Sequence, residues 1–313
     1  MLSRSEILIT KRFLFSKKTE GYVSIFSWFS IIGIALGVAA IIIVMSVMNG
    51  FRSNLIERII GINAHLNIYS FEDLIKKKDI ELIENSLDKN IYDKILYSIE
   101  TQGLVINENI SRGVSIRSYE KLNPKHYLYK KIITNKISLI NFDEIIVGDS
   151  LAKELNLKIG DQIKIAIPKT DKSLLGQIPR FKTLNIIGVF DFGMYEYDAN
   201  LVFISAELSR RLLLIENNIF NKIEFYIDDP KLINNFKNLI DKEIKNNKLN
   251  LYSLSWIDNN SSLMNALKVE KNVMFLILTL IILVAAFNII SSMIMLVNAK
   301  SGDIALLRTI GSS

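Results

Sequence analysis

Two long apolar runs interrupt an otherwise mixed sequence. Gly21–Phe51 extends over 31 residues without a charge, and Asn272–Ala299 extends over 28. At about 1.5 Å of rise per residue, helices of these lengths reach roughly 46 and 42 Å, which exceeds a hydrocarbon core of about 30 Å. The pattern therefore predicts a membrane protein with two transmembrane helices, one on each side of a large polar domain.

The charges that flank the first run predict its orientation. The first 20 residues carry a net charge of +3, because five Lys and Arg residues face two glutamates. The positive-inside rule therefore places both ends of the chain in the cytoplasm and the 220 residues of Arg52–Lys271 outside it. The run is too long for a cleaved signal peptide, and no small-residue cleavage site ends it. Ser3–Phe15 suits either a short interfacial helix or a solvated leader.

Five parts follow from this topology. They are a cytoplasmic or interfacial segment over 1–22, a transmembrane helix over 23–50, an extracytoplasmic domain over 51–271, a second transmembrane helix over 272–299 and a cytoplasmic helix over 300–313. Asp258–Lys271 has helical periodicity, so we expect it to continue into the second transmembrane helix.

Short β-rich segments alternate with helical ones in the outer domain. Strands are predicted over Ala64–Tyr69, Gly113–Ile116, Glu144–Val147, Gln162–Ile167, Leu184–Phe190, Leu201–Ile204, Lys222–Ile227 and Asn250–Leu254. Helices are predicted over Asp79–Leu87, over Ser150–Leu155 with Asp149 or Ser150 as the cap, and over Pro230–Lys245 with Asp229 as the cap. The irregular order predicts an α+β domain rather than a doubly wound parallel sheet.

One predicted hairpin has an unusual loop. Ile163–Ile167 alternates as a strand, Pro168 ends it, and a second strand resumes at Leu184 after Pro179. Two leucines, Leu174 and Leu175, lie in the loop between the prolines. Apolar residues at an exposed loop tip favour a partner or lipid. The alternative is that they fold back onto the domain.

The apolar runs carry two polar or small-residue signals. Gly33 and Gly37 form a GxxxG pattern, which lets a second helix approach closely, although such a pattern also arises by chance. Asn288 lies near the middle of the second run, and its amide needs a hydrogen-bond partner within lipid. We therefore expect its face to point at protein or at a polar cavity. Two helices cannot enclose a pathway, so any transport requires an assembly.

Composition excludes several kinds of chemistry. Without cysteine there is no disulfide, thiolate nucleophile or zinc–cysteine site. His65 and His126 lie outside any motif, and we expect ordinary surface or loop histidines; Asp191, Glu196 and Asp198 are expected to be solvated loop charges. The +6 charge is scattered without interleaved aromatics, which argues against nucleic acid as a partner. No nucleotide-binding or hydrolase motif is present, so we expect no catalytic residue, cofactor or metal.

Several motifs, taken in order, resemble one family. They are Gly33–Ala40 (GIALGVAA), Val44–Arg52 (VMSVMNGFR), Ser255–Asn260 (SWIDNN), Ala266–Lys271 (ALKVEK), Val284–Ile289 (VAAFNI) and Lys300–Gly311 (KSGDIALLRTIG). This series resembles the LolC/LolE/LolF transmembrane subunits of the lipoprotein-releasing ABC transporter, within the MacB/FtsX-like permeases. Phe192–Asp198 (FGMYEYD) resembles the LolF-like form, in which one protein stands in for both LolC and LolE.

The resemblance implies a fold and a function. The outer domain is then a MacB-like periplasmic domain with interleaved Porter and Sabre subdomains. The subunit releases outer-membrane lipoproteins from the inner membrane and passes them to the periplasmic chaperone LolA, while the ATPase LolD hydrolyses ATP. A second transmembrane subunit, a copy or a paralogue, and membrane lipid are further partners. Family members continue into two more spans beyond the docking helix, so we expect a fragment or half of a split protein.

The resemblance also implies site residues. The chaperone-binding hook corresponds to Pro168, Leu174, Leu175, Ile178 and Pro179, and a polar pad beside it corresponds to Lys164, Arg180 and Lys182. Phe181 stands where a polar residue is expected.

Two further sets complete the expected sites. Met45, Met48 and Asn288 are expected to line the lipoprotein cavity, and Asp303, Ile304, Leu306, Leu307 and Arg308 to dock on the ATPase. Two alternatives are another FtsX-like permease that acts on cell-envelope hydrolases and a two-span extracytoplasmic sensor. The 220-residue loop argues against the first, and the 14 residues after Ala299 leave no room for the output domain of the second.

Overall fold

The computed structural model describes residues 21–108, 110–121, 126–133, 139–168, 179–299 and 301–309. The chain divides into two compact units. One combines Met1–Ser53 with Ser262–Ser313, and the other is Asn54–Ser261. Each is described by itself.

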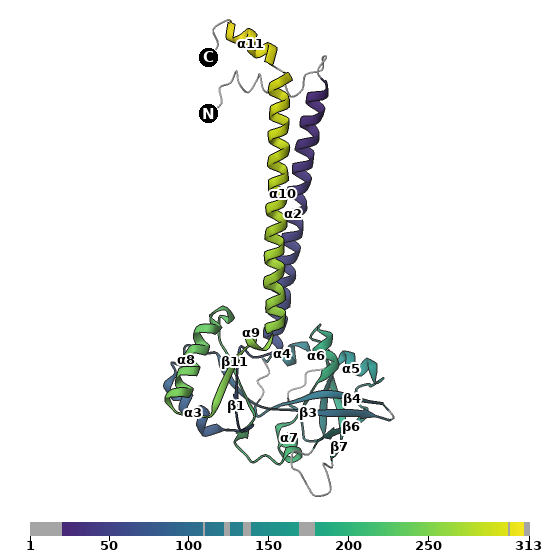
Figure 1. The fold of residues 1–313 in the computed structure, drawn as a ribbon. Helices are drawn as coiled ribbons and strands as arrows, with labels where there is room; N and C mark the ends of the chain where they lie inside the picture. The colour runs from purple at the N-terminus through teal and green to yellow at the C-terminus, as the bar shows by residue number, and fades with distance from the viewer. Residues whose placement is uncertain are drawn as a thin grey trace. The chain divides into compact units, whose positions relative to one another are not determined.

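The first unit is built from long apolar helices (Figure 1). Helix α2 covers Gly21–Ile62, α10 covers Ser261–Ala299 and α11 covers Ser301–Thr309. Within α2 and α10, Ile32–Ile62 and Ser261–Met295 are long and apolar enough to cross a membrane. A continuous helix pairs every interior backbone N–H and C=O group internally, which a segment in lipid requires. Helix α10 includes most of Asp258–Lys271, which we expected to continue into the span.

Gly37 and Arg52 of α2 both contact α10. A Cβ atom built on Gly37 lies 3.4 Å from Ile281 Cγ2, whereas one built on Gly33 meets nothing within 4 Å. Near the end of the contact, Arg52 Nη2 donates to the carbonyl of Leu267 at 3.1 Å. One glycine of the GxxxG pattern therefore packs against α10, and the other remains open.

The second unit is organised around one mixed sheet. Its strands are β1 (Leu66–Ser70), β3 (Lys94–Asn107), β4 (Ile110–Tyr119), β5 (Glu144–Gly148), β6 (Gln162–Ile167), β7 (Arg180–Phe190), β8 (Leu201–Ile204), β10 (Lys222–Tyr226) and β11 (Leu251–Ser255). Among the described residues their order is β11-β1-β10-β3-β4-β8-β5-β7-β6. A further pairing joins β3 to β6, so the six strands from β3 to β6 close into a barrel. Strands β2 (Ile75–Lys76) and β9 (Ile219–Phe220) form a separate pair.

Helices surround this sheet (Figure 1). They are α3 (Lys77–Ser86), α4 (Tyr127–Lys131), α5 (Asp149–Glu154), α6 (Tyr195–Asn200), α7 (Ala206–Leu213), the 3₁₀ turn Pro230–Leu232, α8 (Ile233–Asn246) and α9 (Trp256–Asn259). Helices α3 and α8 pack on each other, and α8 packs on β11. Asp229 caps the turn before α8 as predicted, because its side chain accepts from the Lys231 amide.

Two apolar clusters hold the second unit together. The barrel interior contains β-branched and leucine side chains that are almost fully buried, including Val105, Ile116, Ile145, Ile165 and Ile186. An aromatic cluster contains Phe190, Phe192, Phe203, Tyr119 and Tyr226. In the barrel strands, alternate side chains such as Ile163 and Ile165 of β6 point into the barrel interior. Helices and strands follow one another irregularly along the chain, and the sheet is mixed, as the predicted α+β domain requires.

Two local expectations were wrong, and a third was right only in part. The N-cap of α5 is Gly148, and neither Asp149 nor Ser150 caps it, since Asp149 lies inside the first turn and pairs with Lys153. His65 and His126 lie in loop positions, as one of the two expected alternatives had it, but they are not on the surface: they are 8% and 3% exposed, and each ring accepts a backbone hydrogen bond. Asp198 is 3% exposed; its oxygens accept from the amides of Phe192 and Met194, so it orders this loop instead of standing in solvent.

Candidate functional site

The predicted hairpin is formed by β6 and β7. The two strands pair antiparallel from Gln162 opposite Asn185 to Ile167 opposite Arg180. Pro168 directly follows β6 and Pro179 directly precedes β7 at the open end, where a missing N–H makes continued pairing unfavourable. Leu174, Leu175 and Ile178 lie outside the described residues. The structure therefore confirms the hairpin and leaves the assignment of the hook as a prediction.

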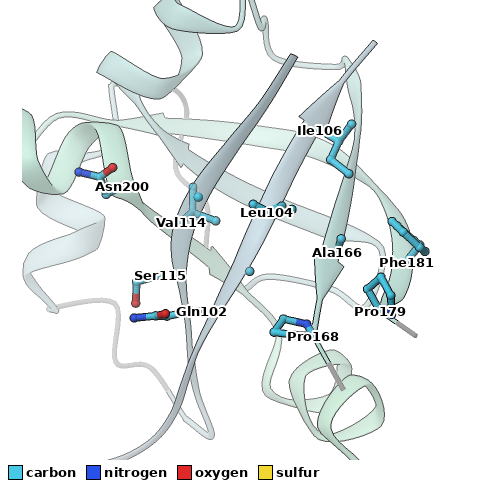
Figure 2. A pocket seen from close by; sticks show the side chains of 12 residues that line it. Gln102, Leu104, Ile106, Val114, Ser115, Ala166, Pro168, Pro179, Phe181 and Asn200 are labelled. Atoms are coloured by element: carbon cyan, nitrogen blue, oxygen red, sulfur yellow. The ribbon is translucent and has the colours of Figure 1, made fainter. Parts of the chain in front are cut away.

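An apolar groove of about 710 Å³ lies beside the two prolines (Figure 2). It is lined by Gln102, Gly103, Leu104, Ile106, Gly113, Val114, Ser115, Ala166, Pro168, Pro179, Phe181 and Asn200. Leu104 is 43% exposed and Phe181 is 55% exposed, so large apolar surface faces solvent here. Contiguous exposed apolar surface on a folded domain marks an interaction site.

A glycine makes the floor of this groove possible. Gly103 lies on β3 where that strand meets both β4 and β6, and a Cβ there comes within 2.8 Å of the Ala166 carbonyl. A side chain at this position would force β3 away from β6 and open the barrel. Ala166 pairs directly with Phe181 across the hairpin, so the small side chain of one leaves room beside the ring of the other.

The structure does not bring the three predicted pad residues together. Lys164 pairs with Thr183 and shares the outward face of β6 with Ala166, which lines the groove. Arg180 and Lys182 alternate with Phe181 and lie on the opposite face of β7. There Arg180 Nη1 donates to the Leu212 carbonyl at 2.7 Å, and Lys182 Nζ lies 2.5 Å from Asp143 Oδ1. Phe181 therefore occupies the groove side, where the resemblance implied a polar residue.

The predicted cavity residues occupy different faces of the membrane helices. Met45 and Met48 are half-buried on α2, on the stripe that also contains Gly37, which packs against Ile281 of α10. Asn288 is exposed on α10. An exposed amide on an apolar helix finds its partner on another helix or in a polar cavity.

The predicted coupling residues all lie on α11. The side chain of Leu306 is 63% exposed, and Arg308 is exposed as well. The side chains of Asp303, Ile304 and Leu307 lie outside the part of the chain that the structure describes. The assignment of these α11 residues to a contact with the ATPase stays a prediction.

The second unit contains a network of buried charges that the sequence pattern did not predict. Arg117, Lys222 and Glu224 are 4%, 4% and 0% exposed. Arg117 and Lys222 both pair with Glu100 of β3, and Lys222 pairs with Glu224 as well. Burial alone would raise the pKa of Glu100, but attraction to Arg117 and Lys222 outweighs it and holds the pKa well below its usual range. The same balance lowers the pKa of Glu224. The available signal was that Glu100, Arg117 and Glu224 interrupt apolar alternation in strands.

Comparison with known proteins relates this chain to a known family. Residues 27–243 match the family described as MacB-like periplasmic core domain. The chain is 32% identical to "Lipoprotein-releasing system transmembrane protein LolC" of Neisseria meningitidis serogroup B over 98% of its own length and 74% of that protein. The chain belongs to the LolC/LolE family.

Two further relatives agree with this assignment. The LolC protein of Xylella fastidiosa is 28% identical over 100% of this chain and 75% of its own length. The LolE protein of Haemophilus influenzae is 27% identical over 97% of this chain and 74% of its own length. Family membership confirms the resemblance drawn from the motifs. It also confirms the predicted fold class, a membrane protein with a MacB-like periplasmic domain.

Proposed function

We propose that this LolC/LolE family member is a transmembrane subunit of an ABC transporter that releases lipoproteins from the inner membrane and passes them to a periplasmic LolA-like chaperone. A LolD-like ATPase subunit hydrolyses the ATP, and a second transmembrane subunit, a copy or a paralogue, completes the assembly. Both chain ends lie in the cytoplasm, and the Asn54–Ser261 unit lies in the periplasm. The family favours this function over a cell-envelope permease or a two-span sensor.

The observation that carries the proposal is the apolar rim of the β6–β7 hairpin. Pro168 and Pro179 mark where the loop leaves the barrel, and they border the groove that exposes Leu104 and Phe181. A chaperone that receives acyl chains has an apolar cavity, so apolar loop residues and an apolar rim match it. Leu174 and Leu175 enter that cavity, and Phe181 packs against its edge.

The experiment is co-purification of the chaperone with variant chains. The double variant Leu174→Asp, Leu175→Asp places two charges in an apolar cavity and is expected to lower chaperone capture at least tenfold. The matched control is Leu214→Asp, an exposed leucine in the turn after α7. Unchanged capture by the double variant, with the melting temperature of the wild type, would remove the loop from the mechanism.

A further inference from the structure

A second cavity, of about 980 Å³, lies over the polar face of strands β1, β10 and β3. Every residue that lines it belongs to the Asn54–Ser261 unit. On β1, Asn67 and Tyr69 line the cavity, while Leu66 and Ile68 alternate with them and are fully buried on the other face. The volume lies at the upper end of the range of about 300–1,000 Å³ that is typical of small-molecule sites. The cavity therefore has room for a ligand of more than one ring.

One residue of the lining has an unused hydrogen-bond acceptor. Asn67 is 1% exposed, and its Oδ1 has no hydrogen-bond partner among the described residues. A buried amide oxygen without a donor destabilises a fold, so native proteins rarely keep one without a reason. Because Asn67 lines the cavity, a ligand with an O–H or N–H group can supply the missing donor.

Two tyrosines beside Asn67 form a flat apolar surface. Tyr69 shares the cavity face of β1 with Asn67 and lies directly opposite Tyr252 of β11. Their ring centroids are 5.6 Å apart, the ring planes differ by 25°, and both side chains are half-buried. A sugar ring has C–H groups on its face and hydroxyl groups around its edge. It can therefore pack on an aromatic ring while its hydroxyl groups bond to polar groups beside that ring.

The charges in the cavity favour a neutral ligand. Lys222 Nζ lies 2.8 Å from Glu100 Oε2, and Arg117 Nε lies 3.2 Å from the same oxygen. Both cations that line the cavity are thus engaged with a carboxylate, and neither is left over for an acidic ligand. Two further lining residues, Glu72 and Asp73, are exposed and add negative charge.

The strands beneath the cavity offer side chains rather than free backbone groups. Strand β1 pairs with β10 and β11, β10 pairs with β1 and β3, and β3 pairs with β10 and β4. An extended peptide often binds by adding a strand to an open sheet edge. Each of these three strands already has a partner on both sides. The cavity therefore favours a ligand recognised through its ring faces and hydroxyl groups over a polypeptide.

We propose that this cavity binds a neutral saccharide. One sugar ring packs on Tyr69 and Tyr252, and one of its hydroxyl groups donates to Asn67 Oδ1. The remaining volume accepts the further rings of a short oligosaccharide. This site goes beyond the proposed transport function and does not depend on it.

The test is isothermal titration of the full chain with chitotriose, maltotriose and cellotriose. The detergent must have no sugar head group, because a maltoside or glucoside would compete for the site. At least one of the three sugars is expected to bind. Asn67→Leu removes the acceptor and is expected to weaken that binding about tenfold without lowering the melting temperature. The matched control Asn235→Leu, on the exposed face of α8, is expected to change neither quantity.

Two further measurements test the aromatic surface and the charge. Tyr252→Leu removes one of the two rings and is expected to weaken binding about tenfold. Its control is Tyr195→Leu, an exposed tyrosine on α6 that does not line the cavity, and it is expected to bind as the wild type does. Trigalacturonic acid carries three carboxylates and is expected to bind at least tenfold more weakly than the neutral sugar.

Several results overturn the proposal. They are no binding of any of the three neutral sugars, wild-type affinity in Asn67→Leu or in Tyr252→Leu, and equal binding of trigalacturonic acid. Displacement of the bound sugar by a Ser-Gly-Asn-Ser-Gly-Asn peptide would show that the cavity takes a polypeptide, and it would overturn the proposal as well. If Asn67→Leu fails to fold, Tyr252→Leu decides by itself, since that side chain is half-buried at the cavity wall.

Discussion

Glu100 and Arg117 lie directly opposite each other on β3 and β4, and Arg117 Nε donates to Glu100 Oε2 at 3.2 Å. Lys222, on the other neighbour of β3, donates to the same oxygen at 2.8 Å. One carboxylate therefore holds two buried cations that belong to two different strands. Because β3 belongs to both the barrel and the four-stranded extension, this contact joins the two parts of the sheet.

Glu100→Gln is expected to lower the free energy of unfolding by about 3 kcal/mol, because it leaves Arg117 and Lys222 buried without their shared partner. The matched control is Glu207→Gln, whose pair with Arg211 is exposed on both sides and is expected to contribute less than about 1 kcal/mol. Urea unfolding followed by fluorescence of Trp256 measures both. Equal losses in the two variants would contradict a structural role for the buried network.

The two buried histidines predict acid sensitivity. Burial lowers the pKa of His65 and of His126 from 6.5 to about 4. The folded state thus keeps both rings neutral while the unfolded state takes up protons, so stability is fully present above about pH 6.5 and is lost as the pH falls toward 4. The expected loss is on the order of 3 kcal/mol for His126.

Unfolding midpoints in urea between pH 7.5 and 4.5 measure this dependence. His65→Asn keeps a side-chain acceptor near the Ile227 amide without a titrating group, and His126→Asn does the same near the Leu128 amide. Each variant is expected to make the urea midpoint depend less on pH. The lowered pKa values of Glu100 and Glu224 act only below about pH 4.5, so a profile that both variants leave unchanged would refute the assignment to histidine.

Gly148 closes the contact between the end of β5 and helix α6. A Cβ there would lie 2.1 Å from the carbonyl oxygen of Asp198, which is backbone and cannot turn aside. Gly148→Ala is therefore expected to destabilise the Asn54–Ser261 unit by about 3 kcal/mol. Gly113→Ala is the control, since nothing lies within 4 Å of its Cβ, and it is expected to change stability by less than about 1 kcal/mol. Thermal unfolding of the two variants compares them, and similar melting temperatures would contradict the packing described for Gly148.

The exposed leucine of α11 predicts a contact with the ATPase subunit. Leu306→Asp is expected to abolish co-purification of the LolD-like subunit, because a charge replaces the apolar group that docks. Ser301→Asp, exposed at the start of the same helix, is expected to retain it. Loss of the ATPase from both variants, or from neither, would rule out a specific role for Leu306.

Local pattern predicted much of this fold and little of its chemistry. Lys222–Ile227 and Leu201–Ile204 were predicted as strands because their apolar side chains mark them, and β10 and β8 occupy nearly the same residues. The 14-residue β3 was missed, because the polar residues Glu100, Thr101 and Gln102 interrupt its apolar pattern. Glu100 is stabilised by Arg117 of β4 and by Lys222 of β10, and the latter lies 122 residues away in sequence. The groove was missed for the same reason, because Leu104 and Phe181 become neighbours only when β3 pairs with β6.

In the proposed orientation, the Asn54–Ser261 unit lies on the same side of the membrane as the chaperone, and both chain ends lie on the other side. Protease added to intact spheroplasts, with an epitope tag on each end, measures this directly. We expect the middle of the chain to be digested while both tags remain protected. Cleavage of the tags with survival of the middle would contradict the orientation, and with it the proposed transfer to a periplasmic chaperone.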